Sequence, residues 1–308
     1  MTSVQANAIT VEYEETGPRD APVILLIMGL GMQLIAWPQS LCNGLVARGF
    51  RVIRFDNRDV GHSTPMPAGS LAMTAMMARA LFRLPVRPPY TLIDMANDAI
   101  GLLDALGIPR AHVVGASMGG MIAQLLAIEH PERVKSLTSF MSTTGDRRLP
   151  GPKAKVLRAL LRPRPRNKAV AVRGSMEFFR LIGGSGFPPT DAELRDKVER
   201  AVQRSYRPAA VLRQLIAIQA APSRVQALRR VRVPTLVLHG SDDPLVPMAG
   251  GEDTAANIPG ARLRIIPGMG HFLPEALVPL LVDEIAAHCL AVEDAAQGKV
   301  ASAAGGSP

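Results

Sequence analysis

The chain has 308 residues, of which 47% are hydrophobic and 20% are charged, so it can bury a sizeable core and is unlike a disordered chain. Aromatic residues amount to only 4%, which argues against a base-stacking surface for single-stranded nucleic acid. The net charge of +9 suits an anionic partner, but the basic residues concentrate between Arg147 and Arg232, and no nucleic-acid-binding module accompanies them.

The cysteines and the N-terminus bear on the compartment. Cys42 and Cys289 match no metal-binding spacing and are too few for a disulfide framework, which favours a reduced, cytoplasmic setting but leaves a single bridge open. Residues 1–17 lack the basic and apolar segments of a signal peptide. The apolar run 23–37 is shorter than the roughly 18 to 20 residues that span a bilayer, and glycines interrupt it, so we expect no membrane span.

In chain order, the first 141 residues predict strands that alternate with helices. Residues 9–17 alternate as a hairpin strand does, and the apolar run 22–29 suits a buried strand. The segment 74–89 is rich in Met, Ala and Arg and breaks at prolines. Further strands are expected within 50–64, 111–114 and 134–145, and helices at 43–49, 91–108 and 121–130.

The pattern changes after Gly145. Residues 146–230 are helical in periodicity, contain glycine- and proline-rich breaks and lack any strand-length β-branched run. This segment is too long for a simple connection and predicts an inserted lid. A buried strand returns within 231–244, the last strand lies within 261–274, and an amphipathic helix follows at 277–292.

These elements predict an α/β fold with a mostly parallel, doubly wound sheet, because strands that alternate with helices bury both faces of a sheet. The expected core comprises residues 1–141 and 231–292, with a helical lid at 142–230. The small, polar tail at 293–308 is expected to be disordered.

One serine lies in a pattern that suits a nucleophile. Residues 115–119 read Gly-Ala-Ser-Met-Gly, which fits G-x-S-x-G between a predicted strand and a predicted helix. In such a turn the serine has a strained backbone, so the residues two before and two after it must be small. The turn also places Ser117 at a helix N-terminus, where free N–H groups favour developing negative charge. The alternative is a glycine-rich turn with an idle serine.

A serine hydroxyl needs a base, and His271 is the best candidate among six histidines. It follows Pro-Gly-Met-Gly after the last predicted strand, where glycines free a loop to carry the imidazole over the sheet edge. His62 and His239 are the alternatives. His112 lies in the strand before Ser117, so it is expected to be buried by packing.

The base in turn needs an orienting acid. Asp242 and Asp243 follow a buried strand, at the edge where open α/β sheets carry functional loops. Asp243 precedes Pro244, which biases it to an extended backbone, so we favour Asp243 and assign Asp242 to the turn. The order Ser117, Asp243, His271 matches the Ser…Asp…His order of one large hydrolase fold.

The oxyanion of such a reaction requires two N–H donors. One should be the N–H of Met118, which follows the nucleophile, and the other should come from the loop after an early strand. Residues 28–31, Met-Gly-Leu-Gly, form that loop, and the Leu30 N–H is the expected donor.

These motifs together identify the chain as similar to the α/β-hydrolase fold superfamily over about residues 8–290. The segments that carry the resemblance are LLIMGLG, FDNRDVGHS, GASMGG, HGSDDPLVP and GMGH. Within the superfamily the chain resembles the carboxylesterase group that includes aclacinomycin methylesterase. Many members have His at position 28, Pro at position 31 and Gly at position 59, where this chain has Met, Gly and Asp. These departures bear on the substrate rather than on the fold.

The resemblance and the predicted triad imply a serine carboxylesterase that cleaves small to medium acyl esters through an acyl-enzyme, without cofactor or metal. A lactonase, a C–C hydrolase or a cofactor-free perhydrolase could use the same triad. A non-catalytic ligand-binding protein is the alternative of another class. The expected partner is a small-molecule ester rather than nucleic acid, and the sequence leaves open whether the chain is a monomer or a dimer.

The substrate pocket is expected between the core and the lid. Its expected lining is Gly29, Trp37, Phe178, Phe179, Leu181, Phe187 and Ile218. The basic cluster RALLRPRPRNK at 158–168 has two interpretations. It is either a solvated helical face or a surface that attracts an anionic surface or an acidic substrate.

Overall fold

The sheet of this computed structural model has eight strands in the order β1-β2-β4-β3-β5-β6-β7-β8. The structure describes residues 2–67, 75–79, 84, 86–162, 165 and 167–304, so residues 74, 80–83 and 85 of the segment 74–89 lie outside it. β1 and β2 pair as an antiparallel hairpin and β2 is antiparallel to β4, whereas all later pairs are parallel. The strands are β1 (Thr2–Ala6), β2 (Ile9–Thr16), β3 (Val23–Ile27), β4 (Arg51–Phe55), β5 (Ala111–Ala116), β6 (Val134–Phe140), β7 (Thr235–Gly240) and β8 (Arg262–Ile266).

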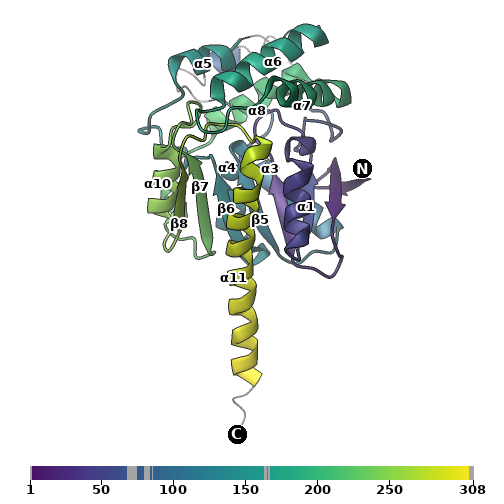
Figure 1. Cartoon of the computed structure of the whole chain (residues 1–308), viewed down its shortest axis with the longest axis vertical. Coiled ribbons are helices and arrows are strands. Elements are labelled where there is room, and N and C mark those ends of the chain that lie inside the picture. Colours follow the sequence, from purple (N-terminus) through teal and green to yellow (C-terminus); the bar gives the residue numbers. More distant parts are fainter. Residues whose placement is uncertain are drawn as a thin grey trace.

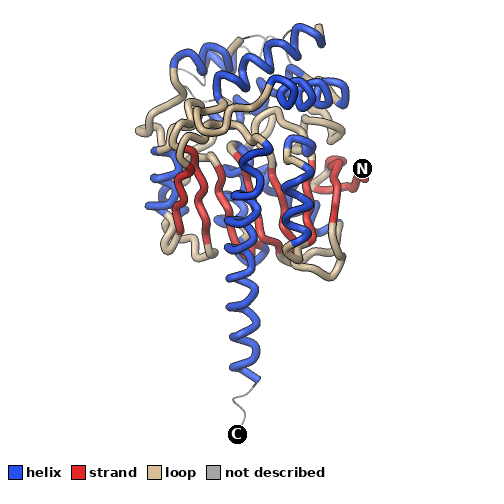
Figure 2. The backbone as a smooth tube through the Cα atoms, in the orientation of Figure 1, coloured by secondary structure: helices blue, strands red, loops and turns tan. Residues whose placement is uncertain are grey.

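Helices cover both faces of this sheet, which confirms the predicted doubly wound α/β fold (Figures 1 and 2). One face packs against α3 (Leu92–Ala105), α4 (Met118–Glu129), α9 (Val225–Leu228) and α10 (Ala249–Asn257), and the other against α1 (Gln39–Ala47) and α11 (Val278–Ala304). Short 3₁₀ turns occur at Leu34–Ala36, Pro131–Arg133 and Glu275–Leu277. The central strands are apolar and fully buried because each is covered on both faces.

Four helices from the predicted lid segment lie across the carboxyl ends of the strands, and we call them the cap helices (Figure 1). They are α5 (Ala154–Leu160), α6 (Lys168–Ile182), α7 (Asp191–Arg204) and α8 (Pro208–Ala220). Two buried ion pairs fix α7 and α8 to the loop after β4: Arg204 lies 2.7 Å from Asp56, and Arg213 lies 2.5 Å from Asp59. Because breaking one buried pair costs several kcal/mol, roughly 3 to 5, these helices are firmly docked.

The prediction of a disordered tail from residue 293 was wrong for the described part, because α11 continues to Ala304. Glu293 fixes this helix to the sheet by accepting hydrogen bonds from His112 Nε2 at 2.9 Å and Lys135 Nζ at 2.7 Å. Alanine-rich sequence then favours helix beyond that contact. The end of α11 extends past the sheet (Figure 1). Among the described residues, no helix combines the length and apolar character that crossing a bilayer requires.

Candidate active site

Ser117 occupies a sharp turn between β5 and α4. Its φ of 58° and ψ of −119° are unfavourable for any residue with a side chain, as expected for a nucleophile turn. A Cβ on Gly115 would lie 2.1 Å from the Gly119 carbonyl oxygen, and one on Gly119 would lie 2.0 Å from the Ile27 carbonyl oxygen. The small residues of the motif are therefore required by backbone contacts on both sides of the serine.

The structure brings Ser117, His271 and Asp243 into one hydrogen-bonded chain. His271 Nδ1 lies 2.6 Å from Asp243 Oδ2, and His271 Nε2 lies 2.9 Å from Ser117 Oγ. With Nδ1–H donating to the carboxylate, Nε2 is left to accept the serine proton. The Asp243 side chain is fully buried, and its other oxygen accepts from the N–H groups of Leu245 and Val246 at 2.9 and 2.8 Å. This carboxylate is therefore held in position from two sides.

The alternative acid and bases lie elsewhere. Asp242 accepts hydrogen bonds from the hydroxyls of Ser185 and Ser241, and these bonds lower the pKa of its carboxyl. His62 Nε2 contacts the Arg204 carbonyl at 3.1 Å. His239 is buried behind Asp243, where Nε2 donates to the Val246 carbonyl at 2.8 Å, and its burial lowers the pKa of the imidazole. Neither histidine is within hydrogen-bond distance of Ser117.

Two backbone N–H groups border the serine on its other side. Met118 is the first residue of α4, so its N–H has no intrahelical acceptor. The loop after β3 passes close by, since a Cβ on Gly29 would lie 3.0 Å from Ser117 Cβ. Among the described residues, the Leu30 N–H forms no hydrogen bond. Neither predicted donor therefore has an acceptor among the described residues.

Polar side chains hold this loop in place. Asn57 Nδ2 donates to the Met28 carbonyl at 2.9 Å. The Gly31 N–H donates to Gln214 Oε1 at 2.7 Å, and Gln214 Nε2 donates to the Arg58 carbonyl at 3.2 Å. Gln214 is fully buried and belongs to α8, so a cap helix helps to set the position of the loop.

The loop that carries the histidine is also bonded to the cap. The His271 N–H donates to the Ile182 carbonyl at the end of α6, at 2.6 Å. Gly184 forms an antiparallel bridge with Met269, and the Gly186 N–H donates to the Gly268 carbonyl at 2.8 Å. The end of α6 and the segment after it therefore support the backbone at His271 and just before it.

A cavity of about 1150 Å³ lies between the cap and the core, with Ser117 and His271 in its lining. Of the predicted pocket residues, Gly29, Phe178, Phe179 and Leu181 line it. The prediction was wrong for Trp37, Phe187 and Ile218. Trp37 is fully buried on the α1 and α11 face of the sheet, Phe187 packs against that same apolar cluster, and Ile218 packs against the cluster on the opposite face.

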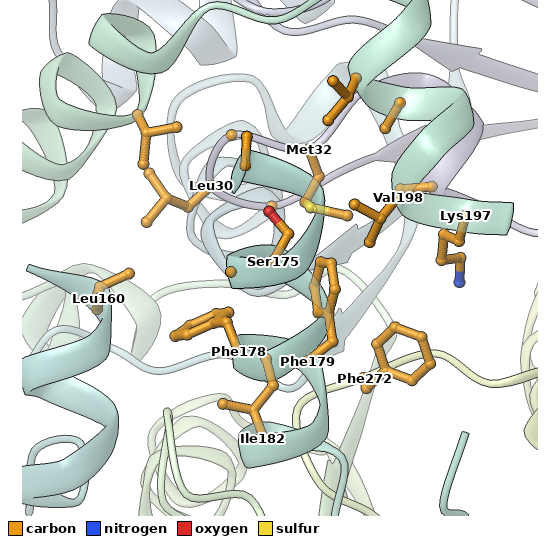
Figure 3. A pocket seen from close by; sticks show the side chains of 18 of the residues that line it. Leu30, Met32, Leu160, Ser175, Phe178, Phe179, Ile182, Lys197, Val198 and Phe272 are labelled. Atoms are coloured by element: carbon orange, nitrogen blue, oxygen red, sulfur yellow. The ribbon is translucent and has the colours of Figure 1, made fainter. Parts of the chain in front are cut away.

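The cavity interior is apolar near the cap helices (Figure 3). Leu30 and Met32 come from the core loop, Phe178 and Phe179 from α6, and Val198 from α7.

Lys197 lies close to this interior. Lys197 Nζ is 4.6 Å from the centre of the Phe272 ring, next to His271 in the chain, and donates to the Leu273 carbonyl at 2.8 Å. Burial lowers the pKa of this lysine to about 8.

Three groups that shape the site were not predicted from the sequence: the Asn57 side chain, the Gln214 side chain and the Ile182 carbonyl. Asn57 lies within the FDNRDVGHS segment, which did mark its loop. Gln214 and Ile182 sit in ordinary helical sequence, and no local pattern distinguishes them.

Comparison with known proteins agrees with this geometry. The family model described as alpha/beta hydrolase fold matches residues 22–275. The chain belongs to the α/β-hydrolase fold family. It is 31% identical to rhodomycin D methylesterase DauP of Streptomyces sp. (strain C5), covering 92% of this chain and 96% of that protein. It is 27% identical to 3-oxoadipate enol-lactonase 2 of Acinetobacter baylyi, covering 86% of this chain and 87% of that protein.

A solved structure shows the same fold. The esterase RhEst1 from Rhodococcus sp. ECU1013 superposes with a TM-score of 0.73 at 19% identity, covering 94% of this chain and 98% of that one. The family and the two relatives compared by sequence support hydrolase activity.

Proposed function

We propose that this chain is a serine hydrolase that cleaves carboxylic esters through an acyl-enzyme intermediate. The observation that carries the proposal is the bonded chain from Ser117 through His271 to Asp243, which opens onto an apolar cavity. A base within hydrogen-bond reach of a hydroxyl, and an acid that orients the base, are the requirements for activating serine. The likeness to rhodomycin D methylesterase, a protein named for ester cleavage, supports the same reaction class.

In the proposed reaction, Ser117 Oγ attacks the ester carbonyl carbon while His271 Nε2 accepts its proton. The N–H groups of Met118 and Leu30 bind the negative oxygen of the tetrahedral intermediate. The C–O bond to the alcohol then breaks, and His271 donates its proton to the departing oxygen. Water attacks the acyl-enzyme with His271 as base, which releases the acid and restores Ser117. Asp243 stabilises the imidazolium throughout without itself taking the proton.

Removal of Ser117 tests this proposal directly. Ser117→Ala should lower kcat for a short 4-nitrophenyl ester by at least about 10³-fold, with a residual rate from the remaining groups. A fluorophosphonate probe should label the natural enzyme once, at Ser117, and leave the variant unlabelled. Near-normal hydrolysis by the variant would contradict the proposal, and an unlabelled, inactive natural chain would favour a ligand-binding role.

The preferred scissile bond requires a panel, because the relatives include a methylesterase and a lactonase. Methyl esters, alkyl esters of graded acyl length and lactones should be compared by kcat/KM, with a C–C substrate and peracid formation as further tests. We expect the esters to rank first. The cavity volume of about 1150 Å³ is at the upper end of ligand pockets, so large acyl groups should be accepted as well as small ones.

A further inference from the structure

The cavity has a cationic, solvent-exposed side. Residues 153–180 contain nine Lys and Arg residues and a single acid, Glu177. Five of these cations are exposed and also line the cavity. Arg180 is paired with Asp191 at 2.8 Å. The other four come from α5, its end and α6: Lys155, Arg158, Arg162 and Arg173. We call these four residues the cationic rim. Glu177 is the one acid among the described lining residues, so the rim carries an excess of positive charge.

These four cations differ from the other charges on the cap. On α7, Arg195 pairs with Glu199 at 3.3 Å and Arg200 with Asp196 at 2.8 Å, as is usual on a solvated helix. In the described chain, no carboxylate lies within ion-pair distance of any rim cation. On a helix face that served only solubility, acidic residues one turn away could pair with the basic ones, as they do on α7. The rim instead leaves its charge available to a ligand.

The charge and the apolar interior lie on one continuous surface. Phe178 and Leu30 line the same cavity as the rim and contribute to its apolar lining (Figure 3). A ligand that fills this space must present apolar surface to the interior and can place an anion among the guanidinium groups. Arginine is well suited to this task because its planar fork binds carboxylate, phosphate or sulfate oxygens in pairs.

We propose that the substrates of this site are anionic esters, with the reacting ester at Ser117 and a carboxylate, phosphate or sulfate at the far end, in the cationic rim. This inference rests on the proposed function, since it assumes that the cavity accepts esters. The rim acts through its field as well as by contact. A cleft lined by one sign of charge raises the association rate of an oppositely charged ligand by roughly 10-fold or more at low ionic strength.

Three soluble 4-nitrophenyl esters of equal acyl length test the inference, ending in a methyl, a carboxylate or a trimethylammonium group. At ionic strength of about 0.01 M, where charges act over roughly 30 Å, kcat/KM should be about tenfold higher for the anionic than for the neutral ester, and lowest for the cationic one. At about 1 M salt, with screening over roughly 3 Å, the three values should converge.

Two matched double variants locate the effect. Arg158→Gln/Arg173→Gln removes two rim charges and should abolish most of the anionic preference, measured as the ratio of kcat/KM for the anionic ester to kcat/KM for the neutral ester. Arg110→Gln/Arg230→Gln removes the same charge just before β5 and β7, at the opposite edge of the sheet, and should keep the preference. Equal loss in both variants would attribute the effect to net charge and would overturn the rim assignment.

The remaining outcomes distinguish a failure of this inference from a failure of the proposed function. An active enzyme with equal kcat/KM for the three esters at low salt would overturn the inference and leave the proposed function intact. Hydrolysis that persists in Ser117→Ala would instead remove the proposed function. Sedimentation with phosphatidylglycerol vesicles, without any preference for the soluble anionic ester, would show that the rim serves a lipid surface and would overturn the substrate assignment.

Discussion

Two sets of serine, histidine and carboxylate lie near opposite edges of the same sheet. They are Ser117, His271 and Asp243 at the carboxyl edge, and Ser136, His112 and Glu293 near the amino edge. In the second set, His112 Nδ1 lies 2.8 Å from Ser136 Oγ, and His112 Nε2 lies 2.9 Å from Glu293 Oε1. By distance alone the two sets are equally good triads, except that the two ring nitrogens have exchanged partners.

Their surroundings differ in every other respect. Ser136 lies in the middle of strand β6 with 1% of its surface exposed, and His112 is fully buried in β5. Neither residue lines the cavity. Ser117, in contrast, is partly exposed, has a strained backbone and directly precedes Met118, whose N–H has no intrahelical acceptor. A nucleophilic serine is therefore distinguished by access to the cavity and by anion-binding groups around it. Three side chains at hydrogen-bond distances are not sufficient.

Removing the charge of each acid is the strongest test of this comparison. Asp243→Asn should lower kcat by about 10³- to 10⁴-fold, because the amide cannot hold the required tautomer or stabilise the imidazolium. Glu293→Gln should leave kcat within about twofold, since surface and distant substitutions leave the site unchanged. Steady-state kinetics on one neutral ester measures both. A comparable loss in Glu293→Gln would show that the amino-edge set takes part in the reaction.

The amino-edge histidine should report on stability rather than on rate. Burial lowers the pKa of His112 from 6.5 to about 4. As the pH falls from 6.5 towards 4, His112 gains a proton in the unfolded chain but not in the folded chain. This group therefore lowers the free energy of unfolding by roughly 1.4 kcal/mol per pH unit. His112→Gln should flatten the dependence of the unfolding free energy on pH between 6.5 and 5.

Urea unfolding of the natural chain and of His112→Gln at the same pH values measures both slopes. An unchanged slope in His112→Gln would mean that His112 takes up a proton in the folded protein.

The smallest expected effect is that of the second serine. Ser136→Ala removes one buried hydrogen bond to His112 and should lower the unfolding free energy by about 1 kcal/mol. It should leave kcat and the stoichiometry of fluorophosphonate labelling unchanged, in contrast to Ser117→Ala. Any loss of label in Ser136→Ala that is not explained by unfolding would argue against the distinction between the two serines.

The sequence predicts the parts of the site that depend on local backbone. Ser117 and Asp243 follow buried strands, and His271 follows the last strand. Each lies within two residues of a glycine or proline, so their loops are recognisable one at a time. The sheet also requires them to meet, because the ends of parallel strands share one edge. The structure brings the three together as predicted, and their catalytic roles await the experiments above.

Contacts between the cap and the core were not predictable in this way. Gly31 and Gln214 are bonded across 183 positions in the chain, and no periodicity identifies which buried glutamine meets which loop. Trp37 and Phe187 were assigned to the pocket because they are large and apolar, but composition does not reveal which face of an element a residue occupies. Helix α10 was not foreseen because its glycines and weak apolar pattern lack a helical signature.

The hydrogen bond from His271 to the Ile182 carbonyl constrains how such chains can be recombined. Residue 182 lies within the cap by sequence, yet it holds part of the core loop that carries the imidazole. A chimera that takes its cap helices from one relative and its core from another would take residues 182 and 271 from different parents. Crossover points that exchange residues 182–186 together with residues 268–271 would preserve the pair, so the natural unit of exchange is discontinuous in the chain.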